Sequence, residues 1–583
     1  MKNNVLKILL WGDEVGKIYW DESKLAAVFN YNPDFVKKNL DIAPFTISIH
    51  SQYGKGHSYR ATSLNSDGYY KGLPPFLADS LPEKWGTTIF NCWARTKGLD
   101  SSNLTPVDRL AFIGKRAMGA FEFMPDTYPW NRDADIDLSK LYDLSKRIYE
   151  QREETLLLPD EENLMAGLCE IGTSAGGQHS KAVIAINSKT GVIRSGQIPL
   201  SSDYNYYLLK FAEGVDFPTV NIEMAYYYMA KEAGINMMPS VLYNIDGKEH
   251  FLTQRYDRLN GEKIFTQTLS AVMPGVESYE ELFRVCDKLK INVQEKEEMF
   301  RRTVFNLFSG NTDDHNRNFS FLMTKNGIWH ITPAYDLTFT ADMTDANYGN
   351  YHFLSLNNKY NGFTIEDLKT FAGRQGIRNA NKNIERVLNS IANFHRHAKK
   401  AGLNNFATNK IEKFLSTLVP VEYANKMTHY IGTKMQPYFT ASGFKVHYFR
   451  LTETMSRDFE LLAEIDGRRY RTTIDGESEE GTLILSKGGN NMGCEDIKSL
   501  IEKYLIPKAE IFRDRQLYLK IKEVSIFNDK TKIRCKTDNG WMPSKKIKVE
   551  DKSYEDEYDL AFKYYKEDLL DEEIQLSRKG RRL

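Results

Sequence analysis

Cysteine is scarce in this chain of 583 residues, which holds five. Cys92, Cys169, Cys286, Cys494 and Cys535 lie far apart, and no two of them have the spacing of a zinc site or a redox pair. A disulfide framework is therefore not expected, and the thiols are predicted to be reduced, as in cytosolic proteins.

Long apolar runs and an excess of one charge are also missing. The apolar run near the N-terminus, within residues 5–11, is far shorter than the roughly 20 residues of a membrane-spanning helix. No small-residue cleavage site follows it, so it is expected to form a first strand. Lys plus Arg and Asp plus Glu both number 78, so no overall field draws the chain to nucleic acid or anionic membrane. These absences predict a cytoplasmic protein without membrane association.

The order of the predicted elements indicates several domains. Domains of roughly 100–200 residues would give about three to five, and no solenoid repeat or low-complexity tract is present. A strand-rich front is followed by a mainly helical stretch from about 278 to 418. From 419 onward the pattern changes again, with strand-like runs at 444–451, 457–464, 482–486, 516–521 and 531–536, and helix-like runs near 495–505 and 553–574. This outline is typical of a two-lobed nucleotide-binding enzyme with an appended α+β domain.

The densest polar stretch, residues 310–319, carries four ionisable groups and three amides. Four residues separate Asp313 from Asn318, and Asp336 follows later, which is the order in which protein kinases carry their base and two metal ligands. Carboxylate and amide oxygens are hard donors that suit Mg²⁺. Asp313 is therefore the candidate general base, and Asn318 and Asp336 are the candidate Mg²⁺ ligands.

Two other interpretations of this stretch stay open. One is an Asx-rich turn whose side chains cap backbone groups. The other is a metal-dependent hydrolase that uses Asp313, Asp314 and His315, although no second cluster stands at a useful spacing to complete it. His330, on the following predicted strand, is expected to pack or to form a hydrogen bond.

Two segments upstream are candidates for phosphate contacts. Residues 172–181 hold small residues between a predicted helix and a predicted strand, which would let backbone N–H groups approach phosphate oxygens. They match neither the P-loop nor the eukaryotic kinase loop, and a plain surface turn is the alternative. Lys210 ends the predicted strand 206–211, either as a solvated charge or as a lysine that pairs with phosphates.

Two further segments have a functional and a structural interpretation each. A helix is predicted over 219–233, with Thr219 as its cap and Gly234 as its stop. Glu223 in this helix is either a first-turn charge favoured by the dipole or the glutamate of a kinase helix. Gln254 to Arg258 closes a predicted strand, either as a hinge whose backbone contacts adenine or as an edge strand with salt-bridged arginines.

In their order along the chain, these segments resemble the HipA family, bacterial kinases that act as toxins of toxin–antitoxin systems. The resemblance spans about residues 5–418. It rests on Phe112-Ile113-Gly114 with Gly119-Ala120, Ser174 to Lys181, Tyr207 to Lys210, Asn221 to Glu223, Arg255 to Arg258, Gly310 to Ser320, and Pro333 to Asp336. It implies an α+β, two-lobed protein-kinase-like fold with a strand-rich N-terminal part and a mainly helical C-terminal lobe. The expected domains are a HipA N-terminal-like domain (1–126), a HipA-like kinase core (127–418) and an appended α+β domain of unknown role (419–583).

The resemblance implies an ATP- and Mg²⁺-dependent serine/threonine protein kinase. Asp313 would take the proton of the substrate hydroxyl, and Asn318 and Asp336 would hold Mg²⁺. Ser174 stands where family members autophosphorylate, and the added charge there ejects the loop and inactivates the kinase. The implied nucleotide contacts are Gly176, Gly177, Gln178, His179, Ser180, Lys181, Lys210, Gln254, Arg255, Tyr256, His315 and Tyr335.

The resemblance also implies partners: a protein substrate, such as the aminoacyl-tRNA synthetases known for the family, an antitoxin, and DNA only indirectly through that antitoxin. His179 and Ser180 replace the more usual pair of the family loop. Residues 419–583 are foreign to the compact members and show no helix-turn-helix, and their basic end is expected to be a solvated terminus. The alternatives are a kinase-fold module that only docks a partner and a small-molecule phosphotransferase.

Overall fold

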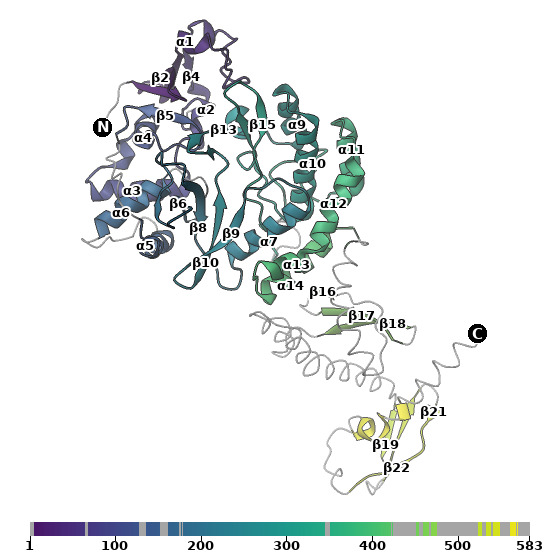
Figure 1. Ribbon diagram of the computed structural model, residues 1–583. Helices are drawn as coiled ribbons and strands as arrows, with labels where there is room; N and C mark the ends of the chain where they lie inside the picture. The colour runs from purple at the N-terminus through teal and green to yellow at the C-terminus, as the bar shows by residue number, and fades with distance from the viewer. Residues whose placement is uncertain are drawn as a thin grey trace. The chain divides into compact units, whose positions relative to one another are not determined.

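The structure, a computed structural model, describes residues 5–64, 68–127, 136–151, 161–173, 177, 179–343, 350–420, 423, 451–453, 459–465, 468–474, 523–526, 532–537, 540–548, 560–566 and 568–569. Its contacts divide the chain into two units, Met1–Met427 and Thr428–Leu583. Helices and strands of both units are labelled in Figure 1. In these described parts no helix is both long and apolar enough to cross a membrane.

The first unit begins with an antiparallel sheet of five strands in the order β4-β3-β2-β1-β5. The strands are β1 (Leu6–Leu10), β2 (Asp13–Asp21), β3 (Ala26–Tyr31), β4 (Tyr59–Arg60) and β5 (Phe121–Met124). The associated helices are α1 (Pro33–Val36), α2 (Pro75–Ala78), α3 (Lys84–Thr96) and α4 (Pro106–Ile113). Helix α4 packs against β2 and β5, and the expected first strand is confirmed as β1.

A second five-stranded antiparallel sheet, in the order β7-β6-β8-β10-β9, forms the centre of the kinase-like part. Its strands are β6 (Lys181–Asn187), β7 (Ile193–Ser195), β8 (Tyr204–Lys210), β9 (Ser240–Ile245) and β10 (Lys248–Gln254). Helices α5 (Leu138–Gln151) and α6 (Glu162–Gly172) precede it, and α6 packs against both α3 and β6. Lys181 and Lys210 face each other across the ladder of β6 and β8.

Helix α7 (Thr219–Glu232) packs against β9 and β10 and corrects one expectation. Its cap residue is Pro218, and Thr219 is already the first helical residue. The Thr219 hydroxyl donates to the Glu213 carbonyl oxygen at 3.2 Å, so it does not cap the helix. The predicted stop is confirmed, because Gly234 follows the helix with a positive φ of 77°.

The chain from Tyr279 to Leu418 is mainly helical, as predicted. Its helices are α9 (Tyr279–Lys288), α10 (Val293–Phe308), α11 (Ile365–Arg374), α12 (Ala380–Ala392), α13 (Phe394–Lys400) and α14 (Asn405–Leu418), and the short α8 (Leu269–Val272) precedes them. A three-stranded sheet of β13 (Phe265–Thr268), β14 (Ser320–Met323) and β15 (Trp329–Ile331) lies beside them, and β11 (Arg258–Leu259) pairs with β12 (Glu262–Lys263). The α+β class with a strand-rich front and a helical back is therefore as expected.

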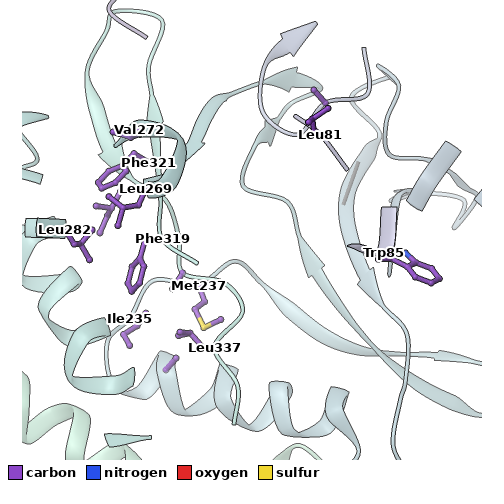
Figure 2. Close-up of a cluster of buried hydrophobic side chains, with 14 of the residues drawn as sticks. Leu81, Trp85, Ile235, Met237, Leu269, Val272, Leu282, Phe319, Phe321 and Leu337 are labelled. Atoms are coloured by element: carbon purple, nitrogen blue, oxygen red, sulfur yellow. The ribbon is translucent and has the colours of Figure 1, made fainter. Parts of the chain in front are cut away.

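One apolar cluster joins the sheets and helices of the first unit. Figure 2 shows Phe319, Phe321 and Leu337 in this cluster together with Leu269 and Leu282. Phe319 is the last residue of the polar stretch, Phe321 lies two residues beyond it, and Leu337 directly follows Asp336. The core therefore fixes the backbone on which the candidate base and metal ligands stand.

The described residues of the second unit form two small antiparallel sheets. One consists of β16 (Leu451–Glu453), β17 (Phe459–Ile465) and β18 (Arg468–Ile474), and the other of β19 (Glu523–Ile526), β20 (Lys532–Thr537), β21 (Gly540–Trp541) and β22 (Lys545–Lys546). The strand-like runs at 457–464 and 531–536 are confirmed as β17 and β20, and residues 560–566 are helical within the run at 553–574. The runs at 482–486, 495–505 and 516–521 lie outside the described residues, as does 444–451 except for Leu451.

Candidate active site

Lys210 connects two carboxylates that come from distant parts of the chain. Its ammonium donates to Glu223 Oε1 of α7 at 2.6 Å and to Asp336 Oδ1. The side chains of Lys210 and Glu223 are only 14% and 11% exposed. Lys210 is therefore not a solvated charge at a strand end, and Glu223 is not simply a first-turn charge favoured by the helix dipole. Burial by itself would raise the pKa of Asp336, but Lys210 and then Lys181 hold this pKa well below its usual value. The site therefore presents a firmly ionised carboxylate.

A second lysine lies under the glycine-containing stretch. Lys181 begins β6, is 4% exposed, and has its pKa lowered by burial. Gly177 has a positive φ of 92°, and a Cβ built on it would lie 2.5 Å from Lys181 Nζ. Another residue would be strained at this φ, and its Cβ would push the ammonium aside. A cation beneath a loop backbone is a suitable cradle for phosphate oxygens.

The two residues that depart from the family loop pattern fasten the loop to Glu213. His179 Nδ1 lies 2.6 Å from Glu213 Oε2, while the Ser180 N–H and hydroxyl donate to Glu213 Oε1 at 3.1 and 2.9 Å. Sequence reasoning did not single out Glu213, because nothing local marks a carboxylate 33 residues away as a loop anchor. Ser174, Gly176 and Gln178 lie outside the described residues.

The N-terminal part of the first unit also reaches this loop. The Gly177 N–H donates to Glu83 Oε2 at 2.5 Å, and Glu83 Oε1 lies 3.3 Å from Arg317 Nη1 in the polar stretch. The Trp85 N–H donates to the Gly177 carbonyl oxygen at 3.2 Å, and its indole N–H donates to the Lys181 carbonyl oxygen at 2.9 Å. Glu83 and Trp85, at the start of α3, are functional candidates that sequence reasoning missed. Trp85 is labelled in Figure 2.

Asp313 stands on a loop that backbone contacts hold in place. Helix α10 ends at Phe308, Gly310 follows with a positive φ of 68°, and the Asp313 N–H donates to Thr340 Oγ1 at 3.1 Å. The carboxylate is 47% exposed and lies 3.7 Å from His315 Nε2. Burial raises the pKa of Asp313, and the nearby His315 opposes this increase. An accessible carboxylate with a raised pKa is suited to accept a proton.

Asn318 and Asp336 provide the oxygen donors expected for a cation. The Asn318 amide donates to the Asp313 carbonyl oxygen at 2.7 Å, which directs the nitrogen end of the amide to the loop and leaves the oxygen end as the donor for a metal. Asp336 has a positive φ of 53°, an uncommon conformation for a non-glycine residue. One ionised carboxylate and one amide oxygen fit Mg²⁺, which completes its shell with water and phosphate oxygens.

Asp314 has a structural role, because its carboxylate is held by three neighbouring groups. Its buried carboxylate accepts from the Tyr279 hydroxyl at 2.6 Å and the Phe353 N–H at 2.8 Å, and lies 2.9 Å from His352 Nδ1. It therefore holds the polar stretch against residues 352–353. Among the described residues, no group of three or more His, Cys, Asp and Glu side chains could hold a metal ion.

The segment after β10 serves the structure through its arginines. The Arg255 guanidinium donates to both carboxylate oxygens of Asp257 at 2.8 and 2.7 Å, and Arg258 donates to Asp257 at 2.8 Å. Strand β10 is not an edge strand, because β8 and β9 flank it, but the salt-bridged arginines are confirmed. The backbone N–H of Arg255 donates to the Tyr206 carbonyl oxygen at 2.9 Å. The expected nucleotide contact of Arg255 would therefore use its own backbone carbonyl oxygen.

The remaining predicted contacts lie around two stacked rings. The Tyr256 and Tyr335 ring centroids are 5.9 Å apart with an interplanar angle of 24°. The Tyr335 hydroxyl donates to the Arg317 carbonyl oxygen at 2.8 Å and shares a hydrogen bond with Ser320. His330 Nδ1 lies 2.8 Å from Glu295 Oε1, as expected for a residue that forms a hydrogen bond.

The chain is similar to known proteins in sequence and in fold. Two family models match, the HipA N-terminal domain at residues 6–124 and the HipA-like C-terminal domain at residues 173–398, and together they span more than half of the chain. The serine/threonine-protein kinase toxin HipA of Shewanella oneidensis is 21% identical over 356 residues, which is 56% of this chain and 73% of that protein.

Solved structures of other proteins match this chain. A structure of the Shewanella oneidensis toxin–antitoxin system, with HipA, HipB and operator DNA, matches with a TM-score of 0.50 and 17% identity, over 71% of this chain and 95% of that chain. The proinflammatory kinase CtkA of Helicobacter pylori matches with a TM-score of 0.28 and 14% identity, over 39% of this chain and 91% of that chain. The first match shows that this chain has the expected two-lobed, kinase-like α+β fold.

Proposed function

Since the chain belongs to the HipA family, we propose that it is a serine/threonine protein kinase that uses ATP and Mg²⁺ to phosphorylate a protein hydroxyl. The observation that supports this most is the position of Lys210 between Glu223 and Asp336, beside the loop of Asp313. Phosphoryl transfer requires that phosphates are held, that metal charge is placed and that the attacking hydroxyl is aimed. The candidate site has a group for each requirement.

The residues of the site have distinct roles in this proposal. Asp313 accepts the proton of the substrate hydroxyl, and its exposed carboxylate is within reach of a protein substrate. Asn318 and Asp336 hold Mg²⁺, which when bound neutralises charge on the phosphates. Lys181 and Lys210 attract the phosphate oxygens from below the loop. The remaining nucleotide contacts are assigned to the backbone of Gly176 to Ser180, to Gln254, Arg255 and Tyr256, to His315 and to Tyr335.

Four further parts of the proposal rest on the family. Ser174, which follows the buried Thr173 in the sequence, is the autophosphorylation site. The chain acts as a toxin, because its relative from Shewanella oneidensis is named a kinase toxin. An antitoxin partner, with DNA contacted through it, is proposed because the matching structure contains HipB and operator DNA. The substrate is a protein, with aminoacyl-tRNA synthetases as the first candidates.

The test measures phosphate transfer from radiolabelled ATP by the full chain, with and without Mg²⁺, and locates the phosphate by mass spectrometry. We expect Mg²⁺-dependent autophosphorylation at Ser174. Asp313→Ala should lower the rate by about 10²- to 10⁴-fold while ATP still binds. Asp34→Ala, at an exposed aspartate in a surface ion pair, is the matched control and should change nothing.

Three outcomes would contradict the proposal at different points. Full activity of the Asp313→Ala variant would remove Asp313 as the base. ATP binding without transfer to Ser174 or to any of a range of proteins would indicate a docking module instead of an enzyme. Transfer to a small molecule but not to proteins would change the substrate class.

A further inference from the structure

The sheet of β19 to β22 in the second unit has two faces of very different composition. Ile533 and Cys535 of β20 are buried and belong to an apolar cluster with Leu560 and Tyr565 of the helical residues 560–566. Neighbouring residues of a strand point to opposite faces. The residues of β20 that alternate with the buried ones therefore form the other face: Lys532, Arg534 and Lys536.

The register of the neighbouring strands adds a lysine and a tryptophan to this second face. Lys546 of β22 pairs with Lys532, and Trp541 of β21 pairs with Lys536. Trp541 is 38% exposed, and the guanidinium carbon of Arg534 lies 4.3 Å from its ring centroid. The basic face is defined as Lys532, Arg534, Lys536, Trp541 and Lys546.

Two lysines of this sheet lie beside or opposite acidic residues. Lys545 lies on the helix side, where its ammonium pairs with Asp568 and donates to the Tyr564 carbonyl oxygen at 2.7 Å. Lys536 lies opposite Glu523 in the ladder of β19 and β20. The cations of the basic face that are left to contact a ligand are therefore Lys532, Arg534 and Lys546.

We propose that the basic face binds single-stranded nucleic acid. Lys532 and Lys546, which are exposed neighbours across two strands, contact successive phosphates. Trp541 supplies a ring on which a base stacks, and Arg534 beside it adds both charge and a planar surface. A basic surface with interspersed aromatic rings is the common solution for holding single strands without reading their sequence.

The geometry favours a single strand over a duplex. The major groove of a duplex admits a helix or a two-stranded ribbon, whereas here a face of several strands carries the groups. Residues on the same face of a β-strand recur about every 6.8 Å. This spacing is twice the rise of about 3.4 Å per nucleotide in a DNA duplex. Extended single strands with unstacked bases match this spacing better. The side chains of Lys532, Arg534 and Lys546 can only donate hydrogen bonds, as phosphates require.

The test measures fluorescence anisotropy of labelled 20-nucleotide strands, as RNA, as DNA and as the duplex, with the full chain at several salt concentrations. We expect the single strands to bind more tightly than the duplex, and the RNA and DNA arms to show which strand is preferred. The double variant Lys532→Glu, Lys546→Glu should weaken binding at least tenfold and lower the salt slope by about 1.4. Trp541→Ala should weaken binding about 5- to 100-fold with the salt slope unchanged.

The controls separate the basic face from other sources of charge. Lys563→Glu changes an exposed charge on the helix and should leave binding intact. Asp313→Ala should also bind normally, because the basic face does not use the kinase site. Lys532→Ala alone is a milder change at an exposed position and should weaken binding by an intermediate amount. This variant tests the basic face even if the double variant misfolds. Any of three results would overturn the proposal. The first is that the variants of the basic face bind nucleic acid as tightly as the unaltered chain. The others are that binding is lost only when Arg578, Lys579, Arg581 and Arg582 are replaced, or that the chain prefers anionic phospholipid vesicles.

Discussion

A carboxylate must be ionised before it can accept a proton, so the pH dependence of the rate reports on Asp313. Burial raises its pKa above the ordinary value of about 3.9, and the neighbouring His315 is the strongest opposing influence. We expect kcat/KM to fall on acidification, at a higher pH than an ordinary aspartate would give. His315→Gln removes the opposing charge and should move this acidic limb to still higher pH.

The measurement is kcat/KM against pH at saturating Mg²⁺, for the unaltered chain and for His315→Gln. The matched control is His330→Gln, because His330 bonds to Glu295 instead of Asp313. An acidic limb that stays in place in the His315→Gln variant would mean that another group controls it.

Glu83 places a negative charge where the phosphates of ATP are proposed to lie. Its carboxylate accepts from the Gly177 N–H and pairs with Arg317, and both groups would otherwise attract phosphate. Glu83→Gln keeps the shape and one acceptor oxygen but removes the charge. Like charges near a protein surface repel by on the order of 1 kcal/mol or more, so ATP should bind about 3- to 10-fold more tightly.

Calorimetric titration with ATP at low and high salt checks this prediction, and the gain should shrink at high salt. The control is Glu162→Gln, at an exposed glutamate of α6. Weaker binding by Glu83→Gln would instead mean that Glu83 prepares the loop for the nucleotide.

At the scale of elements, the junction after β10 ties the second sheet to the N-terminal part. Asp257 accepts from the Gly119 N–H at 2.8 Å, and Arg258 donates to the Gly119 and Ala117 carbonyl oxygens at 2.9 and 3.2 Å. Burial would raise the pKa of Asp257, but Arg255 and then Arg258 hold it well below its usual value. The carboxylate therefore stabilises the fold above about pH 3.9, and this contribution is lost as pH falls through the folded-state pKa.

Asp257→Asn would leave two buried guanidinium groups without their counter-charge. We expect a loss of about 3–5 kcal/mol of stability at neutral pH, with a smaller difference from the unaltered chain near pH 3. Urea unfolding followed by tryptophan fluorescence at both pH values measures this. Asp34→Asn, in an exposed pair with Lys37, is the control and should not shift the midpoint. A loss that is the same at both pH values would show that the charge is not responsible.

The sequence predicts elements best where several local signals agree. Helix α7 combines apolar periodicity with a glycine stop, and its end was placed correctly. Its cap was assigned to Thr219 instead of Pro218, because the carbonyl that binds the Thr219 hydroxyl belongs to Glu213 and cannot be seen in the local pattern. The short spacing from Asp313 to Asn318 likewise revealed the central loop.

The rest of the site depends on contacts that span the chain. Glu83 is 94 residues from Gly177 in sequence, and Asp314 meets His352 at a separation of 38 residues. No periodicity or motif predicts such pairs, because only the fold brings them together. The partial exposure of Asp313 and the full burial of Asp314, which divide their roles, are consequences of the same packing.

At the scale of the whole molecule, each unit has an apolar cluster of its own among the described residues. The cluster of the first unit ends with Val419, and that of the second runs from Ile533 to Leu569. We therefore expect a chain that ends at Met427 to fold, to keep the thermal transition of the first unit and to retain ATP-dependent labelling. The same truncation should abolish binding of single-stranded nucleic acid.

A shorter chain that ends at Leu403 is the informative comparison. It lacks α14, whose buried Ile411 and Leu415 belong to the cluster of the first unit. Each such side chain contributes about 1.5–3 kcal/mol by burial, so this chain should unfold at a lower temperature or fail to fold. Calorimetry of the two truncated chains beside the full one decides the matter. If the chain ending at Met427 were as unstable as the shorter one, the two units would depend on each other for folding, and separate cores would not explain the domain boundary.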